Sequence, residues 1–402
     1  MAPLAGIKVL DLTRVLAGPW ATMTLGDLGA EIWKIEHPTD GDDTRGWRPP
    51  EIGGESTYYL CANRNKSSVA LDLKAPEGLA ILRELAGRAD VLIENLRFGT
   101  LERLGLGWEA MHALNPRLIY CSISGYGRVS PRAGDPGYDG VIQAEAGLMS
   151  VTGEADGEPV KHGVAVTDVV TGMNATQAVL AALFARERTG AGQFIDIALL
   201  DSGLALLVNV GSGWLNAGVV PRRFGNGHAT VVPYGTFRGS DTGFVLGCGN
   251  DRQFALLCRQ VIGRPDLAED PRFLRNRDRQ RNRDVLLALL SELFSRRTAA
   301  AWVEVLRAAD IPTGLVRDVP EALSAPEVRA RGAVQRIRHP TAGEVQVVAS
   351  PLRLHGTPPV APTSPPLLGE HTRSVLTEVL GMDAATLADL LARGVIAESV
   401  AG

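Results

Sequence analysis

Strand-like and helix-like segments alternate through the first 125 residues, and this alternation limits the possible folds more than any other feature of the chain. Residues 7–13 (IKVLDLT) and 31–36 (EIWKIE) have strand character, and Gly18-Pro19 between them opens a helix expected over residues 18–28. The alternation continues with strand-like segments at 68–73, 91–95 and 117–124 and helical segments at 76–88 and 100–114. Alternating elements of this length are βαβ units, which build a mainly parallel sheet with right-handed crossovers.

The pattern changes after residue 220. Residues 234–237 and 244–247 have the character of an antiparallel hairpin, and helical segments follow them. Residues 357–368 (TPPVAPTSPPLL) are rich in proline and therefore cannot form regular structure, so we expect them to act as a connector. We expect three parts: a large, Rossmann-like α/β domain at 1–220, a smaller α+β domain at 221–325, and at 326–402 a linker and C-terminal segment that returns to the large domain.

Composition and charge argue against several classes of protein. The 402 residues are 45% hydrophobic and 21% charged, and 41 basic against 45 acidic residues give a net charge of −4, which provides no electrostatic footprint for nucleic acid. The four cysteines lie far apart without a CxxC pair, and the N-terminus lacks the basic and apolar regions of a signal peptide. Because we also find no apolar run long enough to cross a bilayer, we expect a soluble, cytoplasmic protein.

The common nucleotide-binding and hydrolytic motifs are missing from the sequence. Gly105-Leu-Gly107-Trp-Glu-Ala110 is the nearest match to GxGxxG, but it follows a helical segment instead of a strand. No GxxxxGK[ST] loop, GxSxG elbow or HExxH metal motif occurs. A parallel-sheet enzyme with this sequence therefore needs another source of chemistry.

Asp168 is the side chain best placed to supply that chemistry. It stands in Gly163-Val-Ala-Val-Thr-Asp168-Val-Val-Thr-Gly172, at the start of a long helix expected over residues 166–186. The helix dipole and unpaired N–H groups favour a carboxylate there, and a carboxylate can attack a thioester carbonyl to form a mixed anhydride. A plain N-cap aspartate fits the same position, and the local sequence does not separate the two interpretations.

Three further features suit ligand binding, and each has an ordinary structural alternative. The loop Arg14-Val-Leu-Ala-Gly-Pro19 joins the first strand to a helix N-terminus, where backbone N–H groups can hold an anion, but a generic βα turn explains it equally well. Tyr138, in Asp135-Pro-Gly-Tyr138-Asp139-Gly, is either a binding residue or a packed loop tyrosine. Residues 63–66 (NRNK) and Arg103 add positive charge near strand ends, where solvated surface charge is the simpler explanation.

The segments that combine these features follow one another in a specific order. They are LDLTRVLAGPWATMTLGDLGAEIWKIE, GDDTRGW, NRNKSSVALDLK, IENLRFGTLERLGLG, YCSISGYG, PGYDGVIQAEAGLMSVTG and VAVTDVVTG. Together with PLLGEHTRSVLTEVLG at 366–381, they resemble the family III CoA-transferases (the CaiB/BaiF type) over nearly the whole chain.

The resemblance implies a covalent mechanism with Asp168 as the nucleophile. The aspartate would attack an acyl-CoA donor to give an aspartyl anhydride and free CoA thiolate, and the thiolate would then form an aspartyl-CoA thioester. An acceptor carboxylate would reverse both steps. No cofactor is bound permanently in this scheme, because coenzyme A and acyl-CoA are substrates.

The resemblance also implies binding residues and an assembly. Family members often have Arg where this chain has His37, and they form homodimers of two interlocked rings. The positions that match CoA contacts of the family are Val15, Leu16, Ala17, His37, Leu71, Asn95, Leu96, Arg103 and Tyr138.

Two rival functions remain at this stage. The α-methylacyl-CoA racemases share the family but use a histidine at the position of Tyr138, and a tyrosine, which ionises near about pH 10, is a poor substitute for it. A non-catalytic acyl-CoA-binding protein would tolerate loss of Asp168, which is present.

We expect the donor and acceptor to be small dicarboxylic acids, with succinyl-CoA as the donor. A guanidinium can hold a second carboxylate through two parallel hydrogen bonds. The candidates for this contact, which are otherwise ordinary surface charges, are Arg45, Arg48, Arg222 with its neighbour Arg223, and His228.

Overall fold

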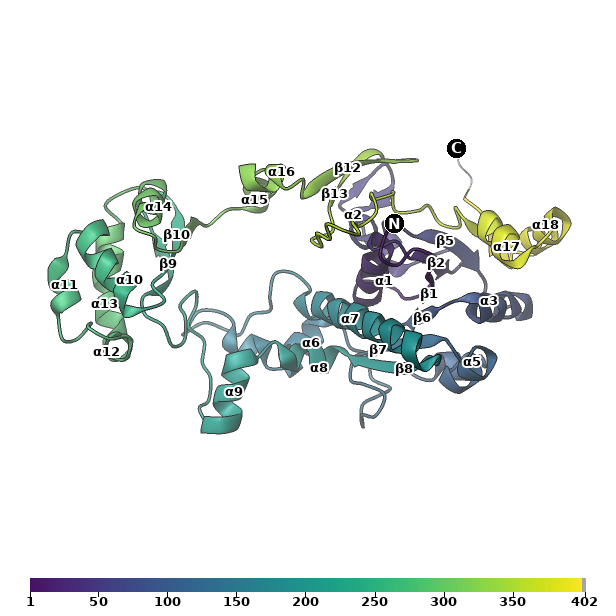
Figure 1. Cartoon of the computed structure of the whole chain (residues 1–402), viewed down its shortest axis with the longest axis horizontal. Coiled ribbons are helices and arrows are strands. Elements are labelled where there is room, and N and C mark those ends of the chain that lie inside the picture. The colour runs from purple at the N-terminus through teal and green to yellow at the C-terminus, as the bar shows by residue number, and fades with distance from the viewer. Residues whose placement is uncertain (400–402) are drawn as a thin grey trace. The chain divides into compact units, whose positions relative to one another are not determined.

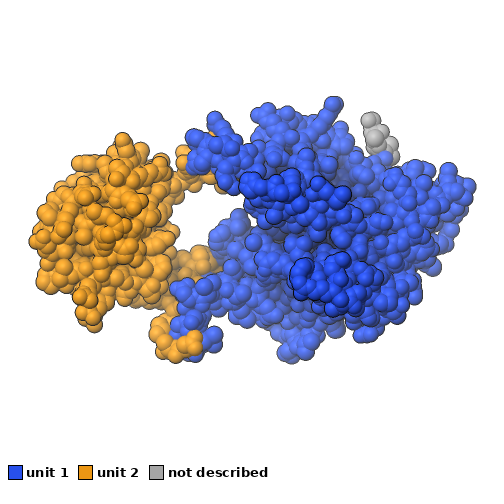
Figure 2. Space-filling model, viewed as in Figure 1, with its two compact units in different colours: residues 1–148, 161–215, 326–402 blue, residues 149–160, 216–325 orange. Residues whose placement is uncertain are grey.

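The computed structural model describes residues 1–399 and divides the chain into two compact units (Figure 2). The first unit comprises residues 1–148, 161–215 and the chain from residue 326 onward. The second unit comprises residues 149–160 and 216–325. The first unit is therefore built from segments that lie far apart in the sequence.

A seven-stranded sheet forms the centre of the first unit (Figure 1). Its order is β14-β5-β2-β1-β6-β7-β8, and all neighbouring strands are parallel except β14, which runs antiparallel to β5. The mainly parallel sheet predicted from the alternation of elements is thus confirmed. The strands are β1 (Lys8–Leu12), β2 (Glu31–Glu36), β5 (Ser67–Leu71), β6 (Val91–Glu94), β7 (Ile119–Ser124), β8 (Phe194–Ala198) and β14 (Ile396–Ala397).

The strand order determines where a ligand can bind. Counted along the chain, the six parallel strands have the order 3-2-1-4-5-6 of a doubly wound sheet, so the direction of winding reverses between β1 and β6. The loops that leave these two strands diverge to opposite faces of the sheet and open a crevice at their carboxyl ends. The fold therefore predicts a binding site beside the residues that follow Leu12 and Glu94.

Helices cover both faces of the sheet and give the first unit two apolar cores. Leu10 of β1 belongs to the core beneath α3 (Pro76–Arg88) and α17 (Thr372–Leu380), while Val9 belongs to the core beneath α1 (Ala17–Asp27) and α7 (Val166–Thr189). Successive residues of a strand point to opposite faces, which explains this division. The remaining helices of the unit are α2 (Thr57–Ala62), α4 (Thr100–Arg103), α5 (Trp108–Leu114), α6 (Asp139–Glu145), α8 (Leu199–Ala205), α16 (Pro326–Ala330) and α18 (Ala384–Ala392).

One expected helix is wrong in extent. Residues 100–114, predicted as a single helix, form the two short helices α4 and α5. Gly105 between them has a φ of 70°, a left-handed conformation that glycine adopts readily and that ends a helix.

The small strands of the unit are β3 (Glu51–Ile52), β4 (Glu55–Ser56), β12 (Val334–His339) and β13 (Gly343–Val348).

The second unit has its own core under a three-stranded antiparallel sheet. Its strands are β9 (Tyr234–Arg238), β10 (Gly243–Gly247) and β11 (Thr313–Leu315), of which β9 and β10 form the predicted hairpin. Phe237, Phe244 and Trp302 surround the ring of Phe294 with centroid distances of 5.0–5.2 Å. Its helices are α10 (Asp251–Leu256), α11 (Pro265–Glu269), α12 (Asn276–Arg281), α13 (Arg283–Phe294), α14 (Ala299–Ala308) and α15 (Val319–Leu323), and α9 (Val208–Ala217) spans the boundary between the units.

The longest helix, α7, runs beside α1 on one face of the sheet (Figure 1). By length and composition alone it could span a membrane, contrary to the expectation that no such segment exists. Its buried residues, among them Ala175 and Val179, pack in the core on that face of the sheet. Gly172 marks the close crossing with α1, because a Cβ there would lie 2.5 Å from the carbonyl oxygen of Ala17. Asp168 precedes Gly172 by four residues and so lies on the same side of α7.

We predict that Gly172→Ala lowers the free energy of unfolding by about 1–3 kcal/mol, because overpacking at the crossing outweighs the better helix propensity of alanine. Gly213→Ala in α9 is the matched control, since a Cβ at that helical glycine meets nothing within 4 Å. Urea unfolding followed by circular dichroism measures both variants. Equal stability of the two variants would contradict the close crossing as the constraint on residue 172.

Candidate active site

A cleft of about 460 Å³ opens where the winding of the sheet reverses. Its walls come from the loops that follow β1, β6 and β7 and from the beginnings of α1 and α7. Asp168 lines this cleft together with six of the expected CoA-contacting residues. They are Val15, Leu16, Ala17, Asn95, Leu96 and Tyr138. Residues from four separate regions of the sequence are thus brought together at the place that the strand order predicts.

Asp168 is not the N-cap of its helix. The N-cap of α7 is Ala165, and Asp168 is the third residue of the first turn. The capping acceptor is instead Asp139, whose Oδ1 accepts hydrogen bonds from the backbone nitrogen of Thr167 at 2.9 Å and from Thr167 Oγ1 at 2.5 Å. Since another carboxylate caps the helix, capping does not account for the side chain of Asp168, which faces the cleft.

The environment of Asp168 makes its carboxyl group a weaker acid than an ordinary aspartate. Burial, and then the negative charge of Asp139, raise the pKa of Asp168 to about 7. Both causes disfavour the ionised form, the first by removing water and the second by like-charge repulsion. Near neutral pH the group therefore exists in both protonation states, which is typical of a carboxyl group with a chemical role.

Tyr58 in α2 and Asp139 interact electrostatically with Asp168, and the sequence analysis assigned neither of them a role. Burial raises the pKa of Tyr58 to about 12, and the negative charge of Asp168 contributes, so the phenol stays protonated. The ring of Tyr58 rests edge-on against Trp47 with a centroid distance of 4.9 Å. No local sequence pattern indicates this interaction, because Tyr58 and Asp168 lie far apart in the sequence.

The loop after β1 is tied to the loop after β6 across the reversal point. The side chain of Asn95 accepts a hydrogen bond from the backbone nitrogen of Arg14 and donates one to its carbonyl oxygen, both at 2.9 Å. This double contact joins the two loops that form opposite walls of the cleft. Asn95 therefore contributes to the shape of the site whether or not it contacts a ligand.

The other three expected CoA contacts do not line the cleft. His37 directly follows β2, where its Nδ1 lies 3.7 Å from Asp40 Oδ2, and Leu71 ends β5 with its side chain buried in the core. Arg103 ends α4 and donates to Thr100 Oγ1 at 3.2 Å. His37 and Leu71 nevertheless lie at the carboxyl edge of the sheet, the edge on which the cleft opens.

Arg45 does not provide a free cation for a substrate. Its guanidinium donates two hydrogen bonds of 2.8 Å to Glu36, and its Nη2 also contacts the hydroxyl of Tyr59 at 2.6 Å. The side chain is only 11% exposed. We therefore correct the sequence-based assignment of Arg45 as a carboxylate contact, because every strong interaction of this group is satisfied within the fold.

The remaining candidates differ in their freedom to bind. Arg48 is exposed and pairs with Glu51 at 3.3 Å, while Arg223 donates to the carbonyl oxygens of Glu154 and Gly157. His228 in the second unit uses its Nδ1 to accept from the backbone nitrogens of Thr230 and Val231, both at 3.1 Å. These contacts give Arg223 and His228 a role in shaping their own loops.

Arg222 and Arg283 form an unusual cationic pair in the second unit. Their guanidinium carbons lie 4.8 and 4.9 Å from the centroid of the Phe224 ring. Burial, and then the positive charge of Arg222, lower the pKa of Arg283. Two cations near one ring repel each other, and an anion between them would relieve that repulsion. Arg283, which the sequence analysis did not single out, is therefore a second candidate for an anion contact.

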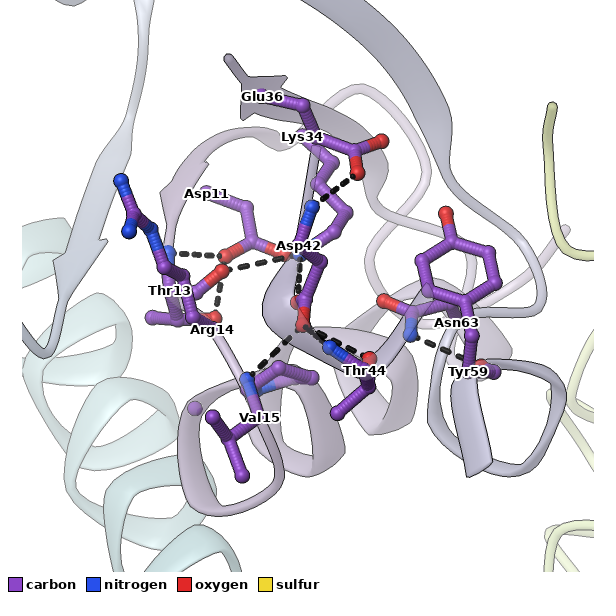
Figure 3. A network of polar contacts seen from close by, with 12 residues as sticks. Asp11, Thr13, Arg14, Val15, Lys34, Glu36, Asp42, Thr44, Tyr59 and Asn63 are labelled. Carbon is purple, nitrogen blue, oxygen red and sulfur yellow. Dashed lines mark hydrogen bonds and ion pairs between the residues drawn. The ribbon is translucent and has the colours of Figure 1, made fainter. Parts of the chain in front are cut away.

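A network of buried charges supports the loop after β1, which forms one wall of the cleft (Figure 3). Lys34 Nζ contacts Asp42 Oδ2 at 2.9 Å, and Lys66 Nζ lies 3.2 Å from Asp11 Oδ2, with none of the four side chains exposed. These groups support the loops of the site from within the fold. Within residues 1–399, no group of three or more His, Cys, Asp or Glu side chains is arranged to hold a metal ion.

Comparison with known proteins identifies the family of this chain. Residues 4–372 match CoA-transferase family III. The chain is 43% identical over 396 residues to a succinyl-CoA:glutarate CoA-transferase of Mus musculus, covering 98% of this chain and 91% of the relative. It is 40% identical over 383 residues to a succinate–glutarate CoA-transferase of Agrobacterium fabrum, covering 94% and 96% of the two chains.

A solved structure shows the same family relationship at the level of the fold. The crystal structure of a CAIB/BAIF family protein from Brucella suis matches this chain with a TM-score of 0.84 and 39% identity, covering 94% of this chain and 99% of that one. Sequence and structure thus agree over nearly the full length, and the chain belongs to the family III CoA-transferases.

Proposed function

We propose that this CoA-transferase moves CoA from an acyl-CoA to a small carboxylic acid through covalent intermediates on Asp168. The observation that carries the proposal is the carboxyl group of Asp168 itself. It lines the cleft at the reversal of the sheet, it does not cap its helix, and its pKa is raised to about 7. A partly desolvated carboxylate gives up little hydration when it attacks, which favours its action as a nucleophile.

The first half of the reaction would form two successive bonds to Asp168. Its carboxylate oxygen attacks the thioester carbonyl, the carbon–sulfur bond breaks, and CoA leaves as the thiolate while a mixed anhydride remains. The thiolate then attacks the aspartyl carbonyl and the donor acid leaves as a carboxylate. The acceptor carboxylate runs both steps in reverse, so the thioester is conserved and no nucleoside triphosphate is needed.

Several neighbours would assist without entering the chemistry. The phenol of Tyr58 stays protonated and interacts electrostatically with Asp168, and the first turn of α7, which carries Asp168, provides a positive dipole. No histidine is among the described residues that line the cleft. The two-base racemase alternative therefore lacks the second group that it needs.

Replacement of Asp168 tests the nucleophile directly. We expect Asp168→Ala and Asp168→Asn to lower kcat below about 1% of the wild-type value, because the covalent route is lost. CoA binding should persist, since the cleft walls remain. Wild-type protein incubated with acyl-CoA and hydroxylamine should carry a hydroxamate that mass spectrometry assigns to residue 168. An acyl group found on a cysteine when hydroxylamine is left out would instead point to a thiol mechanism.

The pH dependence should follow the ionisation of Asp168. Only the carboxylate attacks, so kcat/KM for acyl-CoA should rise from pH 5 to 8 with a midpoint near the pKa of about 7 and then level off. Asp139→Asn removes a negative charge that raises this pKa, so the midpoint should fall.

Glu145→Gln is the matched control for this profile. Glu145 lies on the same helix, α6, but pairs with Tyr126 and Arg132 instead of approaching Asp168. Its replacement should leave the midpoint in place. A profile that is flat between pH 5 and 8, or an equal shift in both variants, would contradict the assignment of the ionising group.

We further propose that the acids exchanged are dicarboxylates, with succinyl-CoA as the donor. The relatives from Mus musculus and Agrobacterium fabrum are named for succinate and glutarate, both short diacids. A second carboxylate needs a cation, and Arg48 is the exposed sequence-based candidate in the unit that carries Asp168.

This substrate proposal predicts a selectivity for diacids. Glutarate should be a better acceptor than butyrate, and Arg48→Met should lower kcat/KM for glutarate about tenfold or more while changing that for butyrate little. Arg373→Met, which removes an exposed guanidinium that pairs with Glu398 in the same unit, is the control and should leave the ratio unchanged. Equal use of butyrate and glutarate by the wild-type protein would refute the diacid assignment.

A further inference from the structure

Val15 adopts a backbone conformation that its side chain disfavours. Its φ of 69° lies in the left-handed region, where the branched Cβ of valine crowds the backbone. Strained residues of this kind persist only when surrounding contacts hold them, and they gather at functional sites. Val15 lines the cleft in the loop between β1 and α1, so the strain lies in the wall of the site.

Contacts from outside the loop hold its backbone from Thr13 to Val15. Asp42 Oδ1 accepts a hydrogen bond from the backbone nitrogen of Val15 at 3.3 Å, and Lys34 Nζ donates to the carbonyl oxygen of Thr13 at 2.9 Å. Between them, Asn95 binds both polar backbone atoms of Arg14. Figure 3 shows Asp42 and Lys34 reaching the loop from the segment around β2.

We call the side chains of Asp42, Lys34 and Asn95 that hold this loop the clamp. Two of them, Asp42 and Lys34, are buried and charged. Asp42 is buried, and besides Val15 it accepts from Lys34 at 2.9 Å and from the backbone nitrogen and hydroxyl of Thr44 at 3.0 and 2.7 Å. Burial opposes the charge of Asp42, but Lys34 and the hydrogen bonds from Thr44 together outweigh burial and lower the pKa of Asp42 to about 2. The carboxylate therefore remains ionised and stays in place throughout the range in which the enzyme works.

We propose that Asp42 and Lys34 are positioning residues that hold the loop from Thr13 to Ala17 in its strained, ligand-competent conformation. The carboxylate of Asp42 fixes the backbone of Val15, and Lys34 fixes both Asp42 and the preceding turn. The loop then presents Leu16, Ala17 and the uncapped start of α1 to the CoA moiety before the ligand arrives. This inference rests on the placement of CoA in the cleft proposed above.

A double-mutant cycle between Asp42 and Val15 tests the clamp. Glycine adopts left-handed backbone without strain, so in the Val15→Gly background the loop no longer depends on Asp42 for its conformation. We expect Asp42→Asn to weaken binding of CoA about tenfold in the wild-type background, because most molecules leave the competent conformation, and less than about threefold in the Val15→Gly background. Isothermal titration with CoA itself measures all four proteins.

Asp27→Asn is the matched control for loss of a buried ion pair in the same unit. Asp27 binds Arg64 at 2.8 and 2.5 Å at the far end of α1, away from the cleft loop. It should lower the thermal midpoint of unfolding while leaving the affinity for CoA within about twofold. If Asp42→Asn does not fold, Lys34→Met/Asp42→Asn leaves no buried cation unpaired and enters the same cycle.

The outcomes are distinct. An equal loss of affinity in both backgrounds, or no loss in either, overturns the clamp, because Asp42 would then act independently of the strained residue. If the wild-type protein transfers CoA through Asp168 but the cycle shows no coupling between Asp42 and Val15, this inference alone is refuted. Wild-type protein that does not bind CoA refutes the proposed placement of the ligand instead.

Discussion

Two buried ammonium groups determine how the loops of the site are held. Lys34 and Lys66 have no exposed side-chain surface, and taking a charge out of water costs several kcal/mol unless an opposite charge compensates. Asp42 and Asp11 provide that compensation, and each ammonium also donates to a backbone carbonyl, of Thr13 for Lys34 and of Pro19 for Lys66. The loop after β1, the start of α1 and the segment after β2 are therefore bound into one body.

The two ammonium groups are not equivalent. Burial lowers the pKa of Lys66 to about 8 despite the nearby charge of Asp11, whereas the three carboxylates around Lys34 outweigh burial and raise its pKa. Lys34 consequently holds its proton more firmly, and it is the residue that contacts Asp42 and the loop of the cleft. A buried pair of this kind adds little to stability compared with apolar packing, so its contribution here is the specific geometry of the loop.

The sequence predicted the parts of the fold that depend on local periodicity, and it missed those that depend on tertiary contact. The strands around Leu10 and Trp33 follow from their apolar runs, as does the long helix that carries Asp168. β14 has only two residues, and its pairing with β5 depends on the return of the chain end, which no local pattern encodes. The assignment of Arg45 failed for the same reason, since its partner Glu36 looks like an ordinary strand residue until the chain folds.

The raised pKa of Asp168 also links catalysis to folding. A carboxyl group that binds its proton more tightly in the native state than in the unfolded chain opposes folding once it is ionised. That penalty is absent below the unfolded pKa of about 4, grows as the pH rises, and is complete above about 7. The form of the protein that carries an ionised Asp168 is therefore its less stable form. The two apolar cores of the first unit must supply the stability that this single carboxylate removes.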